Sequence, residues 1–272
     1  MSVDENLIKE AEFHDSIAEG IVIDKKMADE HYAYDSPASY IANRLPRLKE
    51  QLLNTLGNPL NKRVLVYGCG NDSAAIWFSK LGAIVDAIDI SPKSVKNQQM
   101  IADLLGLKMN CIVMDANNLD LPSEEYDIVY GNAILHHLDI DKSSDEIAKV
   151  LKCGGKAVFR DVMRGNIFLQ IFRIATPFWR TDDEHPLTLE DFTLIRKKFI
   201  SCDIESYILS GLPYFFFAKI MNNVIFKKIG IRFRIPTRDT IYANFDRLDE
   251  RIFSLLPFTR NKAWLCLVTL NK

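Results

Sequence analysis

The sequence lacks the cysteine pattern of a disulfide-linked or zinc-binding protein. It contains 5 cysteines in 272 residues, with no CxxC pair and no histidines near them at metal-binding spacing. We therefore expect reduced, mostly buried thiols, no bound metal and a cytoplasmic location. The cysteines are Cys69, Cys111, Cys153, Cys202 and Cys266.

Long apolar runs are also missing. Residues 1–16, MSVDENLIKEAEFHDS, are acidic and lack the apolar stretch of a secretory signal. The most apolar stretch, residues 212–226, is too short for a membrane span, and Lys219, Asn222 and Asn223 interrupt it. We therefore predict no transmembrane segment. A content of 48% hydrophobic and 26% charged residues is typical of a globular protein with a sizeable core.

The chain has little net charge. Its formal charge of -2 at pH 7 argues against a dedicated nucleic-acid binder. Residues 213–272, however, carry 11 basic and 4 acidic side chains, a net charge of +7. This basic segment is either an ordinary solvated surface or a surface that attracts an anionic substrate or a lipid head group. Peripheral contact with a membrane is considered for residues 212–234.

The periodicity of apolar residues divides the chain into three parts. Residues 1–59 have a helical pattern and are predicted to form an N-terminal cap or lid. Residues 60–163 alternate between short strands and helices, which predicts an α/β fold with a doubly wound, mostly parallel sheet. Residues 164–272 contain an aromatic insert, helices and two late strands of the same domain. The strands of the middle part are expected at 63–67, 83–90, 109–115, 126–131 and 154–162, with helices at 74–81, 91–105 and 145–151.

A long helix is predicted in the N-terminal part. Asp35 and Ser36 before Pro37 are typical of a helix start, and Pro46 is expected to kink the helix that follows. The preceding segment HYAYDS, with Tyr32 and Tyr34, is either a lid over a substrate or a hydrophobic staple for this helix.

The stretch VLVYGCG, residues 64–70, combines a buried strand with a glycine turn ahead of a helix. Such a turn presents free backbone N–H groups and suits an anionic group. Asp89 lies 19 residues beyond Gly70, at the end of the next strand, where a carboxylate can accept hydrogen bonds from ribose hydroxyls. Asp115 with Ala116 ends the third strand, and Asn132 follows the fourth. The pattern indicates a ligand that contains a ribose.

These segments resemble the class I S-adenosylmethionine-dependent methyltransferases that act on small molecules, over about residues 60–163. The resemblance implies a Rossmann-like, seven-stranded sheet with a closing antiparallel strand, and S-adenosylmethionine as cofactor, converted to S-adenosylhomocysteine. In this family the glycine turn contacts the amino acid part of the cofactor, and the next two strand ends bind ribose and adenine. The cofactor-binding residues implied here are Tyr67, Gly68, Cys69, Gly70, Asp89, Ile90, Asp115, Ala116 and Asn132.

The glycine turn departs from the family pattern at two positions. Val66 stands where the family usually has an acidic residue, and Asp72 stands where it usually has a third glycine. The family's acidic residue is an indirect anchor for the cofactor's ammonium group. Asp72 either replaces that anchor or caps the following helix, and the consequence for cofactor affinity is open.

Methyl transfer mainly requires alignment of a nucleophile with the methyl group, and a hydroxyl nucleophile usually needs a general base as well. The catalytic candidates are His136 after the fourth strand, Asp161 at the end of the fifth strand and His185 in the segment RTDDEHPLT. Each also has a structural explanation: a helix start, an ion pair or turn cap, and a charged helix entry. The residues predicted to line the substrate pocket are Tyr32, Tyr34, His137, Phe172, Trp179 and Arg180.

The predicted reaction is methyl transfer to an oxygen or nitrogen of a small, partly apolar metabolite. The segment around His185 is similar to segments in bacterial relatives associated with natural-product or glycolipid pathways, so a biosynthetic role is expected. Two alternatives stay open: an NAD-dependent oxidoreductase, which Asp89 also fits, and a degenerate cofactor-binding domain with a regulatory or partner-binding role. A monomer and a homodimer fit the sequence equally well.

Overall fold

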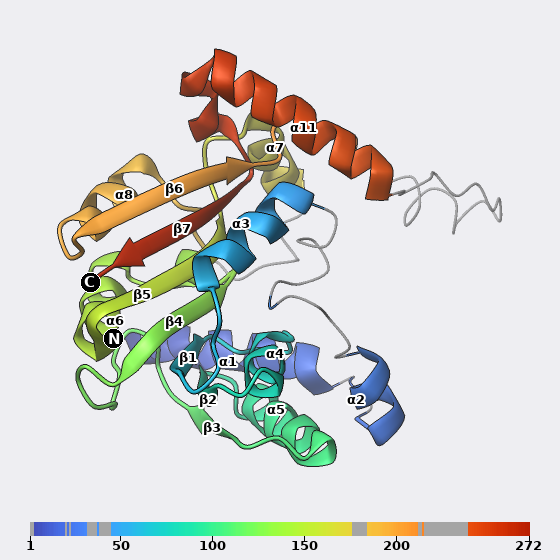
Figure 1. The fold of residues 1–272 in the computed structure, drawn as a ribbon, viewed down its shortest axis with the longest axis vertical. Coiled ribbons are helices and arrows are strands. Elements are labelled where there is room, and N and C mark those ends of the chain that lie inside the picture. The colour runs from blue at the N-terminus through green and yellow to red at the C-terminus, as the bar shows by residue number, and fades with distance from the viewer. Residues whose placement is uncertain are drawn as a thin grey trace.

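The computed structural model describes residues 3–19, 21, 23–31, 37, 45–175, 184–211, 214 and 239–272. Its centre is a seven-stranded sheet with the strand order β3-β2-β1-β4-β5-β7-β6 (Figure 1). The strands are β1 (Arg63–Tyr67), β2 (Ile84–Asp89), β3 (Met109–Val113), β4 (Tyr126–Asn132), β5 (Leu151–Val162), β6 (Ser201–Tyr207) and β7 (Leu265–Asn271). Strands β1 to β5 pair in parallel, and β7 is antiparallel to both β5 and β6. The predicted doubly wound, mostly parallel sheet is confirmed.

Helices cover both faces of this sheet. The helices are α1 (Val3–Glu19), α2 (Lys25–His31), α3 (Pro46–Leu56), α4 (Ala74–Lys80), α5 (Pro92–Leu105), α6 (Ile140–Val150), α7 (Ile167–Ala175), α8 (Leu189–Arg196) and α11 (Asp239–Leu255), with the short 3-10 helices η2 (Leu135–His137) and η5 (Pro257–Lys262). Among the helices that the structure describes, none has both the length and the apolar character needed to cross a membrane.

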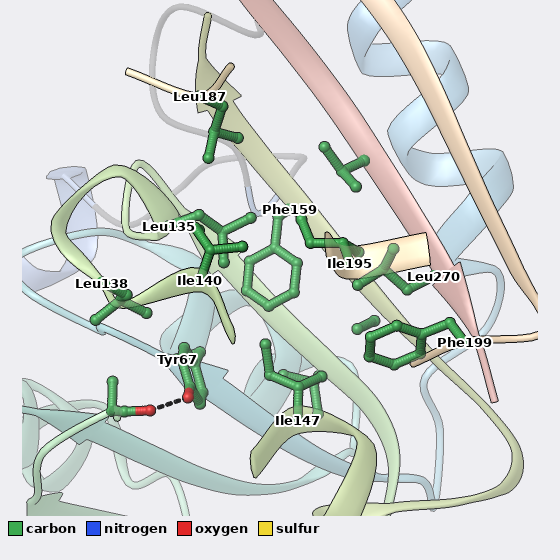
Figure 2. Packing of buried hydrophobic residues seen from close by; sticks show 14 of the residues in the cluster. Tyr67, Leu135, Leu138, Ile140, Ile147, Phe159, Leu187, Ile195, Phe199 and Leu270 are labelled. Carbon is green, nitrogen blue, oxygen red and sulfur yellow. Dashed lines mark hydrogen bonds between the residues drawn. The ribbon is translucent and has the colours of Figure 1, made fainter. Parts of the chain in front are cut away.

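The core lies on both sides of the sheet because successive strand residues point to opposite faces. In β1, Val64 and Val66 belong to the buried cluster that contains α3 and α4, whereas Leu65 and Tyr67 belong to the cluster that contains α6 and α8. Figure 2 shows part of the second cluster. Since β1 is central and fully covered, it contains a continuous apolar run.

Several helix ends follow the expected capping chemistry. Ser91 caps α5 by accepting a hydrogen bond from the Ser94 amide, and Gly106 ends α5 in the left-handed region with φ of 67°. Thr188 and Asp191 form a capping box at the start of α8. Helix α6 begins earlier than predicted, because Asp139 caps it.

The predicted kink at Pro46 is wrong. Leu45 has non-helical backbone angles, with φ of -119° and ψ of 85°, and α3 begins at Pro46. Proline suits the first position of a helix because the amide hydrogen that it lacks has no partner there. The predicted helix start at Asp35 and Ser36 lies outside the described residues.

All five cysteines lie in the described residues and are unpaired, as expected. Cys69 and Cys266 are buried, but Cys153 is exposed and the other two are partly exposed, so the prediction of mostly buried thiols was too strong.

Candidate active site

A cavity of about 320 Å³ lies at the carboxyl ends of the central parallel strands. This is the edge of a doubly wound sheet at which ligands are expected, beside the point where the strand order reverses between β1 and β4. Its wall consists of residues 68–72 after β1, 89–90 after β2, 114–117 after β3, 132–134 and 137–138 after β4, and Leu7, Glu10, His14 and Ile17 of α1. The cavity therefore contains eight of the nine predicted cofactor-binding residues, all except Tyr67.

The glycine turn is shaped by two residues with positive φ. Gly68 has φ of 69° and Gly70 has φ of 44°, and both values favour glycine. A Cβ atom on Gly68 would lie 2.6 Å from the side chain of Ile134. The Gly70 amide donates to Asp89 Oδ2 at 2.7 Å, and the Cys69 amide donates to the Ile88 carbonyl at 2.8 Å. The turn is therefore tied to the end of β2 and approaches the loop after β4 closely.

Asp89 is held by backbone donors on both oxygens. Oδ2 accepts from the Gly70 amide, and Oδ1 accepts from the Ser91 amide at 2.9 Å. Burial raises the pKa of Asp89 above its ordinary value, and the two amide donors offset this only in part. Each carboxylate oxygen can accept a second hydrogen bond, and Asp89 faces the cavity. A ligand with paired hydroxyls fits this arrangement.

Asp72 also faces the cavity and is held by two neighbours. Its carboxylate accepts hydrogen bonds from the Asn132 side-chain amide and, at 2.6 Å, from the Ser73 amide. Arg160 in turn donates to the oxygen of the Asn132 side chain. Burial raises the pKa of Asp72 despite these donors. Val66 is packed in the core, so Asp72 is the carboxylate that the glycine turn presents to the cavity.

The loop after β3 is fixed by its own carboxylate and by a tyrosine. Asp115 accepts from the backbone amide of Asn117 at 2.8 Å, and both residues line the cavity. The hydroxyl of Tyr67 donates to the Ala116 carbonyl, as the dashed line in Figure 2 shows. Tyr67 is fully buried and outside the cavity wall. Tyr67 therefore supports the cavity through Ala116.

His136 and Asp161 form a buried pair behind the loop after β4. Asp161 Oδ1 lies 2.6 Å from His136 Nδ1, and Oδ2 accepts from the Leu135 amide at 2.7 Å and the Ile134 amide at 3.1 Å. Burial disfavours the charged ring, but Asp161 and Glu184 outweigh this effect and raise the pKa of His136 to about 9. Neither member of the pair lines the cavity. In the structure, this pair fixes the loop that brings Ile134 to the cavity.

A second cluster in the cavity wall joins His137, which the sequence predicted for the substrate pocket, to Glu10 and His14, which were not among the predicted site residues. Glu10 Oε1 lies 3.0 Å from His14 Nε2 and 2.8 Å from His137 Nδ1. Glu10 raises the pKa of His14 by hydrogen bonding to it. The spacing of Glu10 and His14 is a sequence signal, since residues four apart share one helix face. Their approach to His137 depends on where α1 packs, and no sequence motif indicates that.

The remaining predicted residues lie away from this wall or outside the description. His185 is exposed, and its amide donates to the His136 carbonyl at 2.8 Å. Phe172 is in α7, but its side chain is not among those described. Tyr32, Tyr34, Trp179 and Arg180 lie outside the described residues, as does most of the segment considered for membrane contact, residues 215–234.

The sheet with its antiparallel β7, and the cavity at its carboxyl edge, define the class I methyltransferase fold. Residues 65–159 match a family model described as a methyltransferase domain. Residues 65–159 therefore form a methyltransferase domain, and the resemblance of the sequence to the class I S-adenosylmethionine-dependent methyltransferases is confirmed.

Curated relatives agree with this identification. The methyltransferase GfsG of Streptomyces halstedii is 29% identical over 145 residues, which are 50% of this chain and 52% of that protein. The sarcosine/dimethylglycine N-methyltransferase of Aphanothece halophytica is 31% identical over 137 residues, 48% of this chain and 49% of the relative. The chain thus spans about half the length of these two relatives.

Solved structures show the same fold. The geranyl diphosphate C-methyltransferase from Streptomyces coelicolor A3(2), solved with Mg2+, geranyl diphosphate and S-adenosyl-L-homocysteine, superposes with a TM-score of 0.62 at 11% identity. The match covers 98% of this chain and 97% of that one. At this identity the likeness concerns the fold, including the late strands and α1.

Proposed function

We propose that this protein transfers a methyl group from S-adenosylmethionine to an oxygen or nitrogen of a small, partly apolar acceptor. The observation that carries the proposal is the single cavity that gathers the glycine turn, Asp89 and Asp115 at adjacent strand ends. When bound there, the cofactor supplies a sulfonium methyl group. The curated relatives include both N- and O-methyltransferases, so both atoms stay in the proposal.

The residues of the cavity fit such a cofactor. The turn at Gly68 and Gly70 would receive its amino acid part, and the free acceptor positions of Asp89 would bind the ribose hydroxyls. Asp115 with Ala116 would hold the adenine. The family's usual acidic residue is replaced here by Val66. Asp72 would contact the ammonium group in its place, because Asp72 is in the cavity wall.

On the acceptor side, the candidates have different roles. His136 and Asp161 are proposed as positioning residues, since they are buried behind the loop after β4. His185 stays a candidate for acceptor contact, together with Tyr32, Tyr34, Phe172, Trp179 and Arg180. A place in a natural-product or glycolipid pathway, a cytoplasmic location and a monomeric or dimeric state are proposed on the sequence arguments alone.

Calorimetric titration with S-adenosylmethionine and, separately, NADH tests the proposal. We expect micromolar binding of S-adenosylmethionine alone, at least a hundredfold weaker in Asp89→Ala because about 3 kcal/mol of hydrogen bonding to a charged group is lost. The matched control is Asp103→Ala, an exposed carboxylate on α5, which should bind as the wild type does. Binding of NADH alone would favour the oxidoreductase, and binding of neither would favour the degenerate domain.

A further inference from the structure

We infer that Glu10, His14 and His137 form a binding site for a divalent transition-metal ion in the wall of the cavity. Their potential ligand atoms all lie within 4.8 Å of one another. One carboxylate and two imidazoles are a ligand set of three-ligand metal sites, in which a further coordination position stays open. The inference revises the expectation of no bound metal, which considered only the surroundings of the cysteines.

The distances suit the insertion of an ion. Glu10 Oε1 is 3.0 Å from His14 Nε2 and 2.8 Å from His137 Nδ1. With metal–ligand bonds of about 2.0 to 2.2 Å, neighbouring ligand atoms of a tetrahedral ion are roughly 3.3 Å apart. Lengthening the two Glu10 distances by a few tenths of an ångström would match this spacing, and the ligand atoms of His14 and His137 lie within 4.8 Å of one another.

The two elements that carry these ligands are fixed in place. Helix α1 packs along α5 (Figure 1), where Asp15 accepts hydrogen bonds from the Ser91 hydroxyl and the Lys93 amide and Asn97 donates to the Ala18 carbonyl. His137 ends η2, whose first amide is bound by the buried Asp161. The three ligands therefore meet on a rigid frame.

His137 also has a carboxylate near its other ring nitrogen. His137 Nε2 lies 3.9 Å from Glu184 Oε1, and Arg173 holds Glu184 with hydrogen bonds of 2.9 Å to its carboxylate and 2.7 Å to its carbonyl. A carboxylate beyond a ligating imidazole is a recurrent feature of metal sites because it orients the ring.

A second trio, His136, His137 and Glu184, is also close enough to hold an ion. His136 is engaged by Asp161 at 2.6 Å, and it does not line the cavity. Glu10 and His14 do line the cavity. An ion held by them and His137 would therefore have its open coordination position in the cavity, where a small molecule can bind.

The ligand chemistry selects the ion and the acceptor class. Mixed nitrogen and oxygen ligands favour ions such as Zn²⁺, Co²⁺ or Fe²⁺ over Mg²⁺ and Ca²⁺, which prefer oxygen. The role of the ion in the reaction rests on the proposed function: the ion would bind an acceptor hydroxyl and lower the pKa of that hydroxyl. The proton leaves to water, the oxygen forms a bond to the methyl carbon, and the electrons of the broken S–C bond stay on sulfur. The inference therefore favours an oxygen acceptor.

Titration with Co²⁺ tests the site, because the bound ion absorbs visible light. The sample is the full chain without affinity tags, from which metal has first been removed with a chelator. We expect stoichiometric binding to the wild type and affinity more than about tenfold weaker in Glu10→Gln and in His137→Ala. Glu12→Gln, an exposed carboxylate on the same helix, is the matched control and should bind Co²⁺ as the wild type does.

Absence of Co²⁺ binding by the wild type, or affinity unchanged in both variants, would overturn the inference. Glu10→Gln and His137→Ala change different elements, and circular dichroism shows whether each variant is folded, so one variant that fails to fold does not remove the test. Titration with S-adenosylmethionine in the presence of chelator separates the two proposals: retained cofactor binding without Co²⁺ binding overturns the metal site alone.

Discussion

On the strand side of the cavity, backbone amides hold the carboxylates of Asp72, Asp89 and Asp115, with one added side-chain contact from Asn132 to Asp72. On the α1 side, the contacts are between side chains of distant segments. Asp89 with Gly70 and Asp115 with Asn117 represent the first kind of contact. Glu10 with His137 represents the second.

The difference has a physical origin. A parallel sheet brings the ends of successive strands to one edge, so backbone and carboxylate meet wherever the strands pair. Contacts between side chains of α1 and η2 exist only if the helix packs at one position on α5. The strand side is thus specified by local motifs, and the α1 side by tertiary packing. The loop after β4 contributes residues to both sides. A substitution that releases this loop is therefore the strongest test of the comparison.

The largest expected effect is that of Asp161→Ala. The substitution leaves His136 without its buried partner and removes the acceptor for the Leu135 amide, so we expect a loss of about 3 to 5 kcal/mol in the free energy of unfolding. Urea denaturation measures it, with the exposed Asp103→Ala as a control that should change by less than about 0.5 kcal/mol. A loss below 1 kcal/mol would show that the pair does not fix the loop.

Gly68→Ala tests the strand side. The alanine would need positive φ, and its Cβ would clash with Ile134 at 2.6 Å, so a destabilisation of about 3 kcal/mol is expected. Gly154→Ala is a matched control, because Gly154 also has positive φ, 75°, but no atom within 4 Å of an added Cβ. That control should lose only about 1 to 2 kcal/mol. Equal losses in the two variants would contradict the close approach of the turn to Ile134.

Asp72→Asn sharpens the comparison within the glycine turn. If Asp72 is the carboxylate for the cofactor's ammonium group, the affinity for S-adenosylmethionine should fall by about 2 kcal/mol, close to thirtyfold. Methylthioadenosine, which lacks the amino acid part, should bind the variant and the wild type equally. Calorimetry measures both ligands, and an equal decrease for the two would assign Asp72 a purely structural role.

Near neutral pH, the smallest effect is the pH dependence of cofactor binding. Burial raises the pKa of both Asp89 and Asp72, and each must be ionised to bind its part of the cofactor. Affinity should therefore fall as the pH falls through these raised pKa values, by about tenfold per pH unit for each proton taken up. In Asp89→Asn, we expect the affinity for S-adenosylmethionine to be weaker than in the wild type at neutral pH, and to decrease less steeply as the pH falls. An unchanged slope in this variant would exclude Asp89 as the source.

The predicted acceptor-side residues show why strand position is insufficient. Asp161 was placed near the acceptor because it ends β5, but successive strand residues point to opposite faces. The Asp161 side chain is buried and accepts a hydrogen bond from the Leu135 amide in the loop after β4. The side chain of its neighbour Arg160 instead donates to Asn132, which lines the cavity. His136 and His137 are neighbours in the 3-10 helix η2, where successive side chains also point in different directions, and of the two His137 reaches the cavity wall.

The sequence by itself determined the sheet, the order of its helices and the carboxylates at its strand ends, because apolar periodicity and glycine turns act over a few residues. Only the tertiary structure decided that α1 closes the cavity, that α3 starts at Pro46 without a kink, and that Glu10 and His14 meet His137. These features depend on which helix faces pack together, and the energies of such packing are distributed over many residues far apart in the chain.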